Sequence, residues 1–146
     1  MSVTIRPLEP ADRTAWNPLW QGYLTFYETD LDDAVTEVTW ARLMTPGEDP
    51  SGFAALNEAG EIIGFTHYLY HRSTWAEGPY CYLEDLYVSE AARGTGAGRA
   101  LIEAVSDRAE KDGAERVYWN TQSFNETARK LYDKLATLTP FVQYRK

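Results

Sequence analysis

The residues with the clearest chemical potential form a glycine-rich loop between a predicted strand and a predicted helix. The loop reads Arg93-Gly94-Thr95-Gly96-Ala97-Gly98-Arg99. Glycine lets the backbone approach a ligand closely and point several N–H groups inward. A helix N-terminus attracts anions through its free N–H groups and its dipole. With an arginine at either side, the loop is predicted to cradle a pyrophosphate group.

Two commoner phosphate-binding loops do not fit this segment. The dinucleotide fingerprint needs G-x-G-x-x-G, whereas these glycines are spaced G-x-G-x-G and Arg99 stands at the third position. A P-loop needs Lys followed by Ser or Thr after its last glycine, and Arg99-Ala100 does not supply that pair. A plain strand–helix connection without a ligand stays open at this point, because short glycine motifs are weak signals.

The elements that must position this loop predict an α/β (α+β) fold in the order β-α-α-β-β-β-α-β-α-β. Alternating patterns and turn residues indicate strands at 3–5, 52–56, 61–71, 80–88, 116–119 and 141–144. Helical spacing and capping residues indicate helices over 16–27, from Asp32 or Asp33 to about 44, over 97–112 and after Asn125. Pro18 is expected to break or restart the first helix. A mixed central sheet with helices on both faces is the natural packing.

A second pattern lies downstream of the loop, in Asn125-Glu126-Thr127-Ala128-Arg129-Lys130-Leu131-Tyr132. With a strand between them, the two segments resemble the R/Q-x-x-G-x-G/A and N-x-x-A-x-x-x-Y signatures of the GNAT (Gcn5-related) N-acetyltransferase superfamily. Segments 82–88 and 128–135 are similar to its Hpa2 and spermidine/spermine acetyltransferase-like branch. Ala136 departs from the pattern, because many relatives have glycine after this helix, so the turn there is expected to differ.

The resemblance implies a site for acetyl-CoA as co-substrate. Its pantetheine arm is expected to pair with the strand backbone where the strand splays from its neighbour, at Leu86, Tyr87 and Val88. Asn125 is expected near the same arm. Backbone N–H groups of the glycine loop, with Arg99 beside them, are expected to hold the pyrophosphate: Arg93, Gly94, Thr95, Gly96, Ala97 and Gly98.

Acetyl transfer to an amine needs a base, because an alkylamine with a pKa near ~10.4 is almost fully protonated at neutral pH. Glu84 is the candidate base, directly or through a water; its alternative is a carboxylate paired with an arginine. Asp85 points to the opposite side in a regular strand, although a bulge would exchange the two. Tyr132 is the candidate acid for the leaving thiolate, with a core tyrosine as its alternative. The Leu86 or Tyr87 N–H is the expected oxyanion donor.

The acceptor is expected to meet the first helix. Tyr23, Tyr27, Glu28 and Asp85 are weak candidates, because aromatic faces with a carboxylate suit an ammonium group. Most aromatics of this helix are expected in the core, Trp16 among them. Polyamine, amino-acid, aminoglycoside and protein-lysine acceptors stay open, with a polyamine-like small amine or a lysine side chain favoured.

Composition narrows the remaining classes. The 146 residues suit one domain, 1–146, and the net charge of -8 argues against nucleic acid. No membrane span, secretory signal or disulfide pair is expected, since Cys81 is the single cysteine, so a cytoplasmic location is predicted. His67 and His71 lack a third ligand, so no metal is expected and both are given structural roles.

Two interpretations compete at this point. One is an N-acetyltransferase, and the other is a non-catalytic acetyl-CoA-binding regulatory module. Retained Glu84 and Tyr132 favour the enzyme. A homodimer through the predicted strand at 141–144 is expected by resemblance only.

Overall fold

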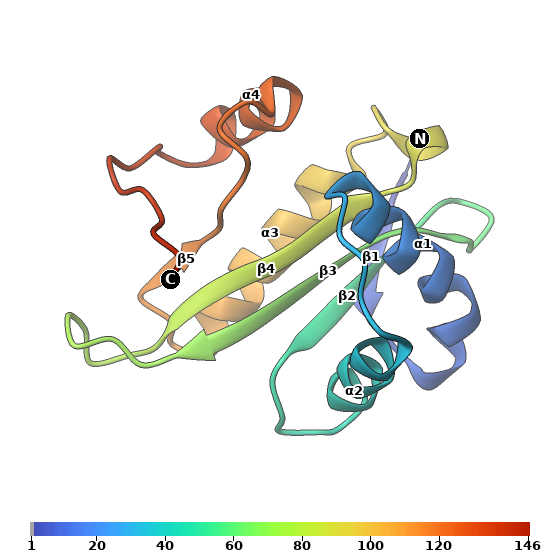
Figure 1. The fold of residues 1–146 in the computed structure, drawn as a ribbon, viewed down its shortest axis with the longest axis horizontal. Coiled ribbons are helices and arrows are strands. Elements are labelled where there is room, and N and C mark those ends of the chain that lie inside the picture. The colour runs from blue at the N-terminus through green and yellow to red at the C-terminus, as the bar shows by residue number, and fades with distance from the viewer. Residues whose placement is uncertain (1) are drawn as a thin grey trace.

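A mixed sheet of five strands forms the centre of the molecule, which a computed structural model describes over residues 2–146 (Figure 1). The strands lie side by side in chain order, and the first four are antiparallel. The fifth strand runs parallel to the fourth, so a helix must connect the two. The strands are β1 (Thr4–Pro7), β2 (Ser51–Leu56), β3 (Ile62–His71), β4 (Tyr80–Val88) and β5 (Arg116–Tyr118).

Helices cover both faces of the sheet, as expected. α1 (Arg13–Phe26) contacts β3 and β4, and α2 (Asp33–Leu43) contacts β2 on the same side of the molecule. α3 (Ala97–Lys111) connects β4 to β5 and packs on the other face, behind the sheet in Figure 1. α4 (Glu126–Leu135) follows β5 and stands apart from the other helices (Figure 1). Short 3-10 turns precede α1 at Pro10–Asp12 and α3 at Glu90–Ala92.

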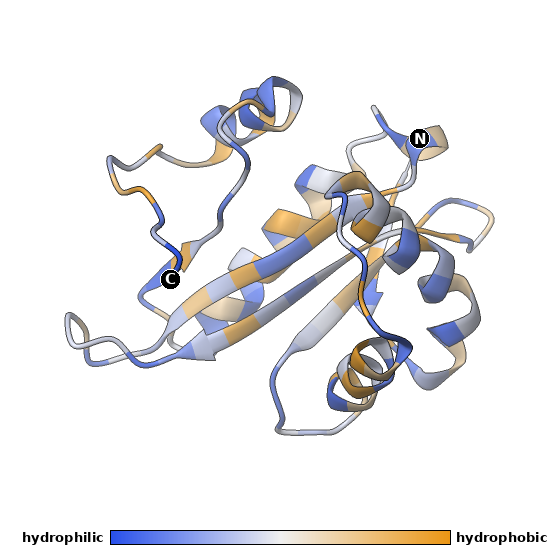
Figure 2. Cartoon of the chain, viewed as in Figure 1, coloured by the Kyte–Doolittle hydropathy of each residue, from blue (hydrophilic) through white to orange (hydrophobic). Residues whose placement is uncertain are grey.

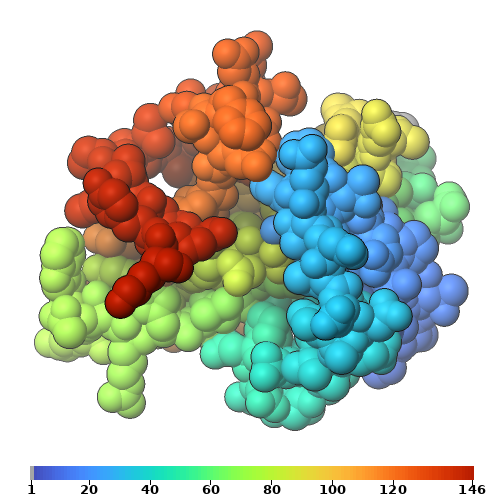
Figure 3. Space-filling model, viewed as in Figure 1, coloured from blue at the N-terminus to red at the C-terminus, as the bar shows by residue number. Residues whose placement is uncertain are grey.

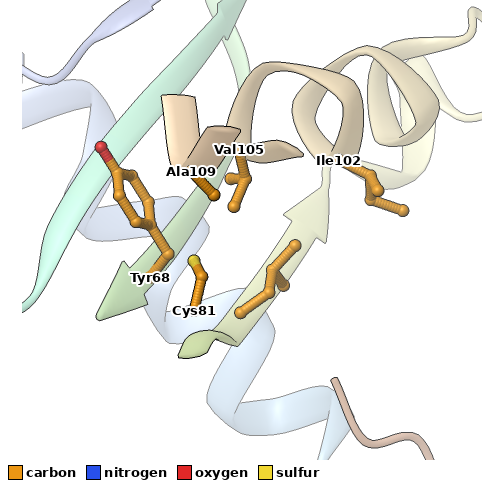
Figure 4. Packing of buried hydrophobic residues seen from close by; sticks show 6 residues of the cluster. Tyr68, Cys81, Ile102, Val105 and Ala109 are labelled. Atoms are coloured by element: carbon orange, nitrogen blue, oxygen red, sulfur yellow. The ribbon is translucent and has the colours of Figure 1, made fainter. Parts of the chain in front are cut away.

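The core divides into two parts because strand side chains alternate between the faces. On the α3 face, Tyr68 and Cys81 pack against three helix residues, Ile102, Val105 and Ala109 (Figure 4). Bands of hydrophobic and hydrophilic residues along β3 and β4 reflect the alternation (Figure 2). The part on the opposite face is aromatic and consists of Trp16, Trp20, Leu24, Trp40 and Phe65. Cys81 is fully buried, so its predicted packing role is confirmed.

Three predicted elements differ from the observed ones. α1 is one continuous helix through Pro18, because Trp16, Trp20 and Leu24 bury its apolar face on both sides of the proline. One lost backbone hydrogen bond is small beside that burial. The fifth strand ends at Tyr118 rather than at 119.

The predicted last strand at 141–144 does not form, and the chain from 137 to 146 has no regular structure. A strand needs a neighbour to accept its backbone hydrogen bonds, and no segment of residues 2–146 pairs with this one. Its apolar side chains are therefore exposed. Among residues 2–146, no helix is both long and apolar enough to cross a membrane, and no group of histidine, cysteine or acidic residues is placed to hold a metal ion.

Candidate active site

The site is centred on β4, because the C-terminal part of this strand has an open edge. β5 pairs with β4 only from Tyr80 to Tyr82. β4 continues to Val88, so from Leu83 onward the edge that faces away from β3 has no strand partner within residues 2–146. The surface is hollowed between the C-terminal part of the chain and the α1–α2 side, with yellow-green atoms at the bottom (Figure 3). An extended ligand with amide groups can pair with such an edge as an added strand does.

A β-bulge in β4 places two carboxylates beside each other. His67 on β3 pairs with Asp85, and the next residue of β3 pairs with Leu83, so Glu84 is the extra residue without a partner. Burial raises the pKa of Tyr23 on α1, and the charges of Asp85 and Glu84 both raise it further. Both carboxylates therefore act on the α1 side. The opposite-side arrangement of a regular strand does not occur, because the bulge interrupts the alternation.

The surroundings of Glu84 suit a proton acceptor. Burial among neighbouring protein atoms raises the pKa of this carboxyl, and the charge of Asp85 raises it further, although the residue stays accessible to solvent. A more basic carboxylate accepts a proton more readily at neutral pH. Within the described chain Glu84 forms no ion pair, so the alternative of an arginine-bound carboxylate is wrong for residues 2–146.

Asp85 is held by a buried histidine that sequence reasoning did not connect with the site. His67 Nδ1 lies 2.9 Å from Asp85 Oδ2. The indole Nε1–H of Trp16 donates to His67 Nε2 at 3.2 Å. His67 and Trp16 are both fully buried. The predicted strands at 61–71 and 80–88 place His67 beside Asp85 only if they pair in the observed register, and the bulge sets that register.

The glycine loop has the geometry of an anion cradle. Gly94 and Gly96 have φ of 84° and 87°, the left-handed region that favours glycine. α3 begins directly after Gly96, and its first hydrogen bond runs from Ala100 N–H to Gly96 O at 3.0 Å. The N–H groups of the first turn, from Ala97 to Arg99, are left without helical acceptors. A Cβ added at either positive-φ glycine meets no atom within 4 Å, so the space before the loop is open.

The side chains of the loop contribute unequally to its charge. Arg93 lies over the ring of Tyr87, with 5.9 Å from its guanidinium carbon to the ring centroid. Arg99 Nε pairs with Glu103 on the next turn of α3 at 2.8 Å, so its charge is partly neutralised. Thr95 Oγ1 donates to a carbonyl of the preceding 3-10 turn at 2.7 Å and closes the loop.

Tyr132 projects from α4 and packs against the part of the core that includes Cys81 and Leu83 of β4. Its ring packs on Trp119, with 5.5 Å between ring centroids and 69° between ring planes. Burial raises the pKa of Tyr132 to about 12, and Tyr27 of α1 adds to the shift. A hydroxyl with this pKa keeps its proton at neutral pH, so it is available as a hydrogen-bond and proton donor to sulfur that gains negative charge.

The weak acceptor candidates differ in position. Tyr23 and Tyr27 lie against each other, with 5.0 Å between ring centroids. Burial raises the pKa of Tyr27, and the charge of Asp85 raises it further, so both tyrosines lie near this carboxylate. Glu28 is exposed after the end of α1 and has a φ of 51°, and its side chain forms no ion pair within residues 2–146. The structure therefore brings together three of the four candidates.

Asn125 caps the N-terminus of α4. Its side-chain oxygen accepts from the Ala128 N–H at 3.2 Å, which confirms the predicted N-cap. The same residue fixes the start of the helix that carries Tyr132. Its expected position near a pantetheine arm stays a prediction.

Comparisons with known proteins point to one family. The sequence model of the acetyltransferase (GNAT) family matches residues 14–136. The D-amino-acid N-acetyltransferase HPA3 of Saccharomyces cerevisiae is 41% identical over 145 residues, which cover 99% of this chain and 90% of the yeast protein. An uncharacterized N-acetyltransferase of Bacillus subtilis, YhfO, is 32% identical and is covered over 87% of its length by 90% of this chain.

Solved structures share the fold at lower identity. A ribosomal-protein-alanine N-acetyltransferase from Brucella melitensis superposes with a TM-score of 0.83 at 22% identity, over 99% of both chains. The aminoglycoside acetyltransferase AAC(6')-Iy, solved with a CoA-based bisubstrate analog, has a TM-score of 0.80 at 21% identity, over 100% of this chain and 99% of its own. The chain belongs to the GNAT acetyltransferase family. It is accordingly an N-acetyltransferase that depends on acetyl-CoA.

Proposed function

We propose that the chain transfers the acetyl group of acetyl-CoA directly to the primary amine of a small molecule or of a lysine side chain. One observation carries the proposal: the open edge of β4 lies beside two carboxylates of the same strand, Glu84 and Asp85. A donor paired with this edge would present its acetyl group next to them. Direct transfer is favoured because Cys81, the single cysteine, is buried and burial raises the pKa of its thiol to about 12, so it is a poor nucleophile.

In this proposal acetyl-CoA lies along β4 and the glycine loop that follows it. The backbone of Leu86, Tyr87 and Val88 would pair with the pantetheine amides, with Asn125 near the arm. The N–H groups from Arg93 to Gly98 would hold the pyrophosphate. The open backbone edge and the unobstructed positive-φ glycines support this fit. When bound, acetyl-CoA supplies the activated acyl group, and the protein aligns it with the amine.

The chemistry then divides among three groups of this chain. Glu84 accepts a proton from the attacking ammonium group, directly or through a water, and its raised pKa supports that task. The N–H of Leu86 or Tyr87 donates to the oxygen that gains negative charge as the amine attacks the thioester carbonyl. Tyr132 donates a proton to the departing sulfur as the C–S bond breaks, and the second proton lost by the nitrogen restores the Tyr132 hydroxyl, so the products are an amide and a free thiol.

The acceptor side is acidic and aromatic, which suits a cation. Tyr23 and Tyr27 of α1 lie near Asp85, and rings with a carboxylate bind ammonium groups. The 41%-identical yeast protein is named for D-amino acids, and thialysine N-epsilon-acetyltransferases of mammals match half of this chain or more. Both names describe small amines, so amino acids stand beside polyamines as the first acceptors to test.

Thiol release from acetyl-CoA over a panel of amines tests this function. The panel contains D- and L-amino acids, polyamines, an aminoglycoside and a lysine peptide. We expect at least one primary amine to raise thiol release well above hydrolysis, with a matching acetylated product by mass. Its tertiary-amine analogue is the matched control, because it has no N–H to replace and cannot form the amide.

A second outcome would support the alternative. If acetyl-CoA binds but no amine on the panel raises thiol release above hydrolysis, the proposed transfer fails for these acceptors. The chain would then act toward them as a non-catalytic acetyl-CoA-binding module. The binding measurement separates this result from a misfolded preparation.

We also propose a homodimer that works in the cytoplasm. Four large apolar side chains are exposed after α4 and are available to a second copy: Leu138, Phe141, Val142 and Tyr144. β5 has only three residues and forms the edge of the sheet. An edge strand and an unpaired apolar segment are complementary partners for strand pairing.

A further inference from the structure

Three side chains from three elements form a buried hydrogen-bonded chain behind the site. It runs from Trp16 on α1 through His67 on β3 to Asp85 on β4. The His67 side chain is 1% exposed, and the Asp85 side chain, at the other end of the contact, is 13% exposed. One end of the chain is therefore sealed in the core, and the other end reaches the face that carries Tyr23 and Tyr27.

The partners of His67 determine where its ring carries a proton. An indole N–H can only donate, so His67 Nε2, which lies 3.2 Å from Trp16 Nε1, must be the acceptor and has no proton. The single proton of the neutral ring is then on Nδ1, where it is donated to Asp85 Oδ2. A doubly protonated ring would place its Nε2–H against the Trp16 N–H, so two donors would face each other inside the core. Trp16 and Asp85 thus require the same tautomer, the one in which His67 donates to Asp85.

We propose that Trp16 and His67 are positioning residues that fix the Asp85 carboxylate toward the ammonium group of the acceptor. This inference rests on the proposed function. A mostly buried carboxylate needs hydrogen-bond donors, and a donor in the core also fixes its direction. No lysine or arginine pairs with Asp85 within residues 2–146, so the charge stays available to a cationic ligand.

The hydrogen bonds from Trp16 through His67 to Asp85 also give two adjacent carboxylates different tasks. Asp85 is held from behind by His67, whereas Glu84 is the unpaired residue of the bulge. The titratable groups that face Asp85 are Glu84, His67, Tyr23 and Tyr27. A fixed Asp85 would orient the acceptor, and Glu84 would then receive its proton. Proper orientation of this kind is a large part of catalysis.

The tautomer is measured first, because it does not depend on activity. The chain has only two histidines, so nitrogen–proton NMR of the rings is simple to assign with His71→Gln as the reference variant. We expect His67 to show a protonated Nδ1 and a bare Nε2 at neutral pH. In Trp16→Phe the indole donor is gone while Asp85 still accepts from Nδ1–H, so we expect the Nε2 resonance to shift and Nδ1 to stay protonated. A wild-type ring protonated on Nε2 would overturn the proposal.

Kinetics of two His67 variants test the positioning role. The side-chain nitrogen of His67→Asn can take the place of Nδ1 and still donate to Asp85, whereas the amide of His67→Gln reaches the place of Nε2 and leaves Asp85 without that donor. We expect His67→Gln to lower kcat/KM for the amine by about tenfold to 100-fold, as for a lost hydrogen bond to a charged group. His67→Asn should recover most of this loss. The KM for acetyl-CoA should stay unchanged in both.

The controls separate positioning from folding and from the proposed function. His71→Gln removes the exposed histidine, which hydrogen-bonds to Tyr118 and not to Asp85. It should leave kcat/KM for the amine unchanged. Equal losses in His67→Asn and His67→Gln, or a parallel rise in the KM for acetyl-CoA, would overturn positioning. If the wild type acetylates no amine, the proposed function fails, whereas the NMR result still decides whether His67 carries its proton on Nδ1, toward Asp85.

Discussion

At the scale of single residues, the division of labour between Glu84 and Asp85 depends on their different surroundings. Asp85 is bonded to His67 and lies mostly buried. Glu84 is accessible, and burial of its carboxyl with the charge of Asp85 raises its pKa. Two carboxylates with different environments are a common source of a base and a fixed charge in one site. Glu84 is therefore the group whose proton can move.

The first prediction concerns Glu84→Gln. As a base, Glu84 works when deprotonated, so activity should rise with pH through its raised pKa, which lies above the ordinary value of about 4.3. Replacement by glutamine removes this acidic limb of the pH profile and should lower kcat by about 100-fold. The measurement is kcat/KM for the amine against pH. Glu77→Gln, an exposed glutamate of the β3–β4 loop, is the matched control; an acidic limb identical in wild type and Glu84→Gln would clear Glu84 of this role.

The same substitution should not cost stability at neutral pH. A carboxyl whose pKa is higher in the folded chain than in the unfolded chain stabilises the fold at low pH, and this contribution is lost as the pH rises through the folded pKa. At neutral pH it is absent, so Glu84→Gln should have an equal or higher Tm. A lower Tm would indicate that Glu84 has a structural role.

The second prediction concerns the proton donor. Tyr132→Phe keeps the ring on Trp119 and removes only the hydroxyl, so the fold and acetyl-CoA affinity should be preserved. Because the pKa of Tyr132 is raised to about 12, its proton is present at assay pH and its loss should lower kcat by about 100-fold. Tyr144→Phe is the control, since that side chain is 94% exposed. Equal turnover in wild type and Tyr132→Phe would assign Tyr132 to the core alone.

Sequence reasoning reached the residues that lie within recognisable motifs and missed those that meet only through the fold. Glu84, Tyr132 and the glycine loop stand in short patterns with chemical meaning. His67 and Trp16 do not, because they are 51 positions apart and become partners only when α1 packs on β3. The bulge at Glu84 is equally hidden, since strand alternation predicts a regular register.

At the scale of elements, most boundaries followed from periodicity and from caps. The β2–β3 hairpin, α3 after the glycines and α4 after Asn125 appear within a few residues of their predicted positions. The continuous α1 did not follow, because Pro18 disfavours a helix locally whereas packing of the apolar face on both sides of it decides the structure. The splay of β4 from β5 was implied by resemblance and has a simple cause: β5 is short.

The third prediction tests the loop as an element that binds anions. Gly96→Asp adds a negative charge where the N–H groups of α3 converge, and Gly96→Asn adds nearly the same volume at the same φ of 87° without the charge. We expect acetyl-CoA affinity to fall in both and to be about tenfold weaker for Asp than for Asn, or about 1.4 kcal/mol. Titration calorimetry measures the difference.

A control places the same aspartate substitution elsewhere. Gly60 has a φ of 81° in the β2–β3 turn, so Gly60→Asp carries the same backbone strain without facing the cradle. It should leave acetyl-CoA affinity unchanged. Equal affinities for Gly96→Asp and Gly96→Asn would mean that no anion is held at this end of α3.

At the scale of the whole molecule, the C-terminal segment has the sequence pattern of a strand but forms no strand in the single chain. The pattern at 141–144 has the alternation of a strand, and Figure 2 shows hydrophobic residues along this part of the chain. A strand also needs a partner, which no sequence pattern within the segment can supply. Within residues 2–146 nothing pairs with it, so this prediction failed for the single chain and depends on a second one.

The last prediction follows from that dependence. Phe141 and Val142 are 73% and 76% exposed in the single chain, so replacing both with serine should not reduce the stability of a monomer. If a second copy covers them, the same change should dissociate a wild-type dimer, because buried apolar area drives association. Sedimentation at several concentrations reports the mass, and Trp75→Ser, which removes a side chain that is 74% exposed on the β3–β4 loop, is the control. We expect a dimer for wild type and for Trp75→Ser, and a monomer for the double variant. A wild-type monomer at all concentrations would assign the segment to solvent, and a double variant that still dimerises would place the interface elsewhere on the molecule.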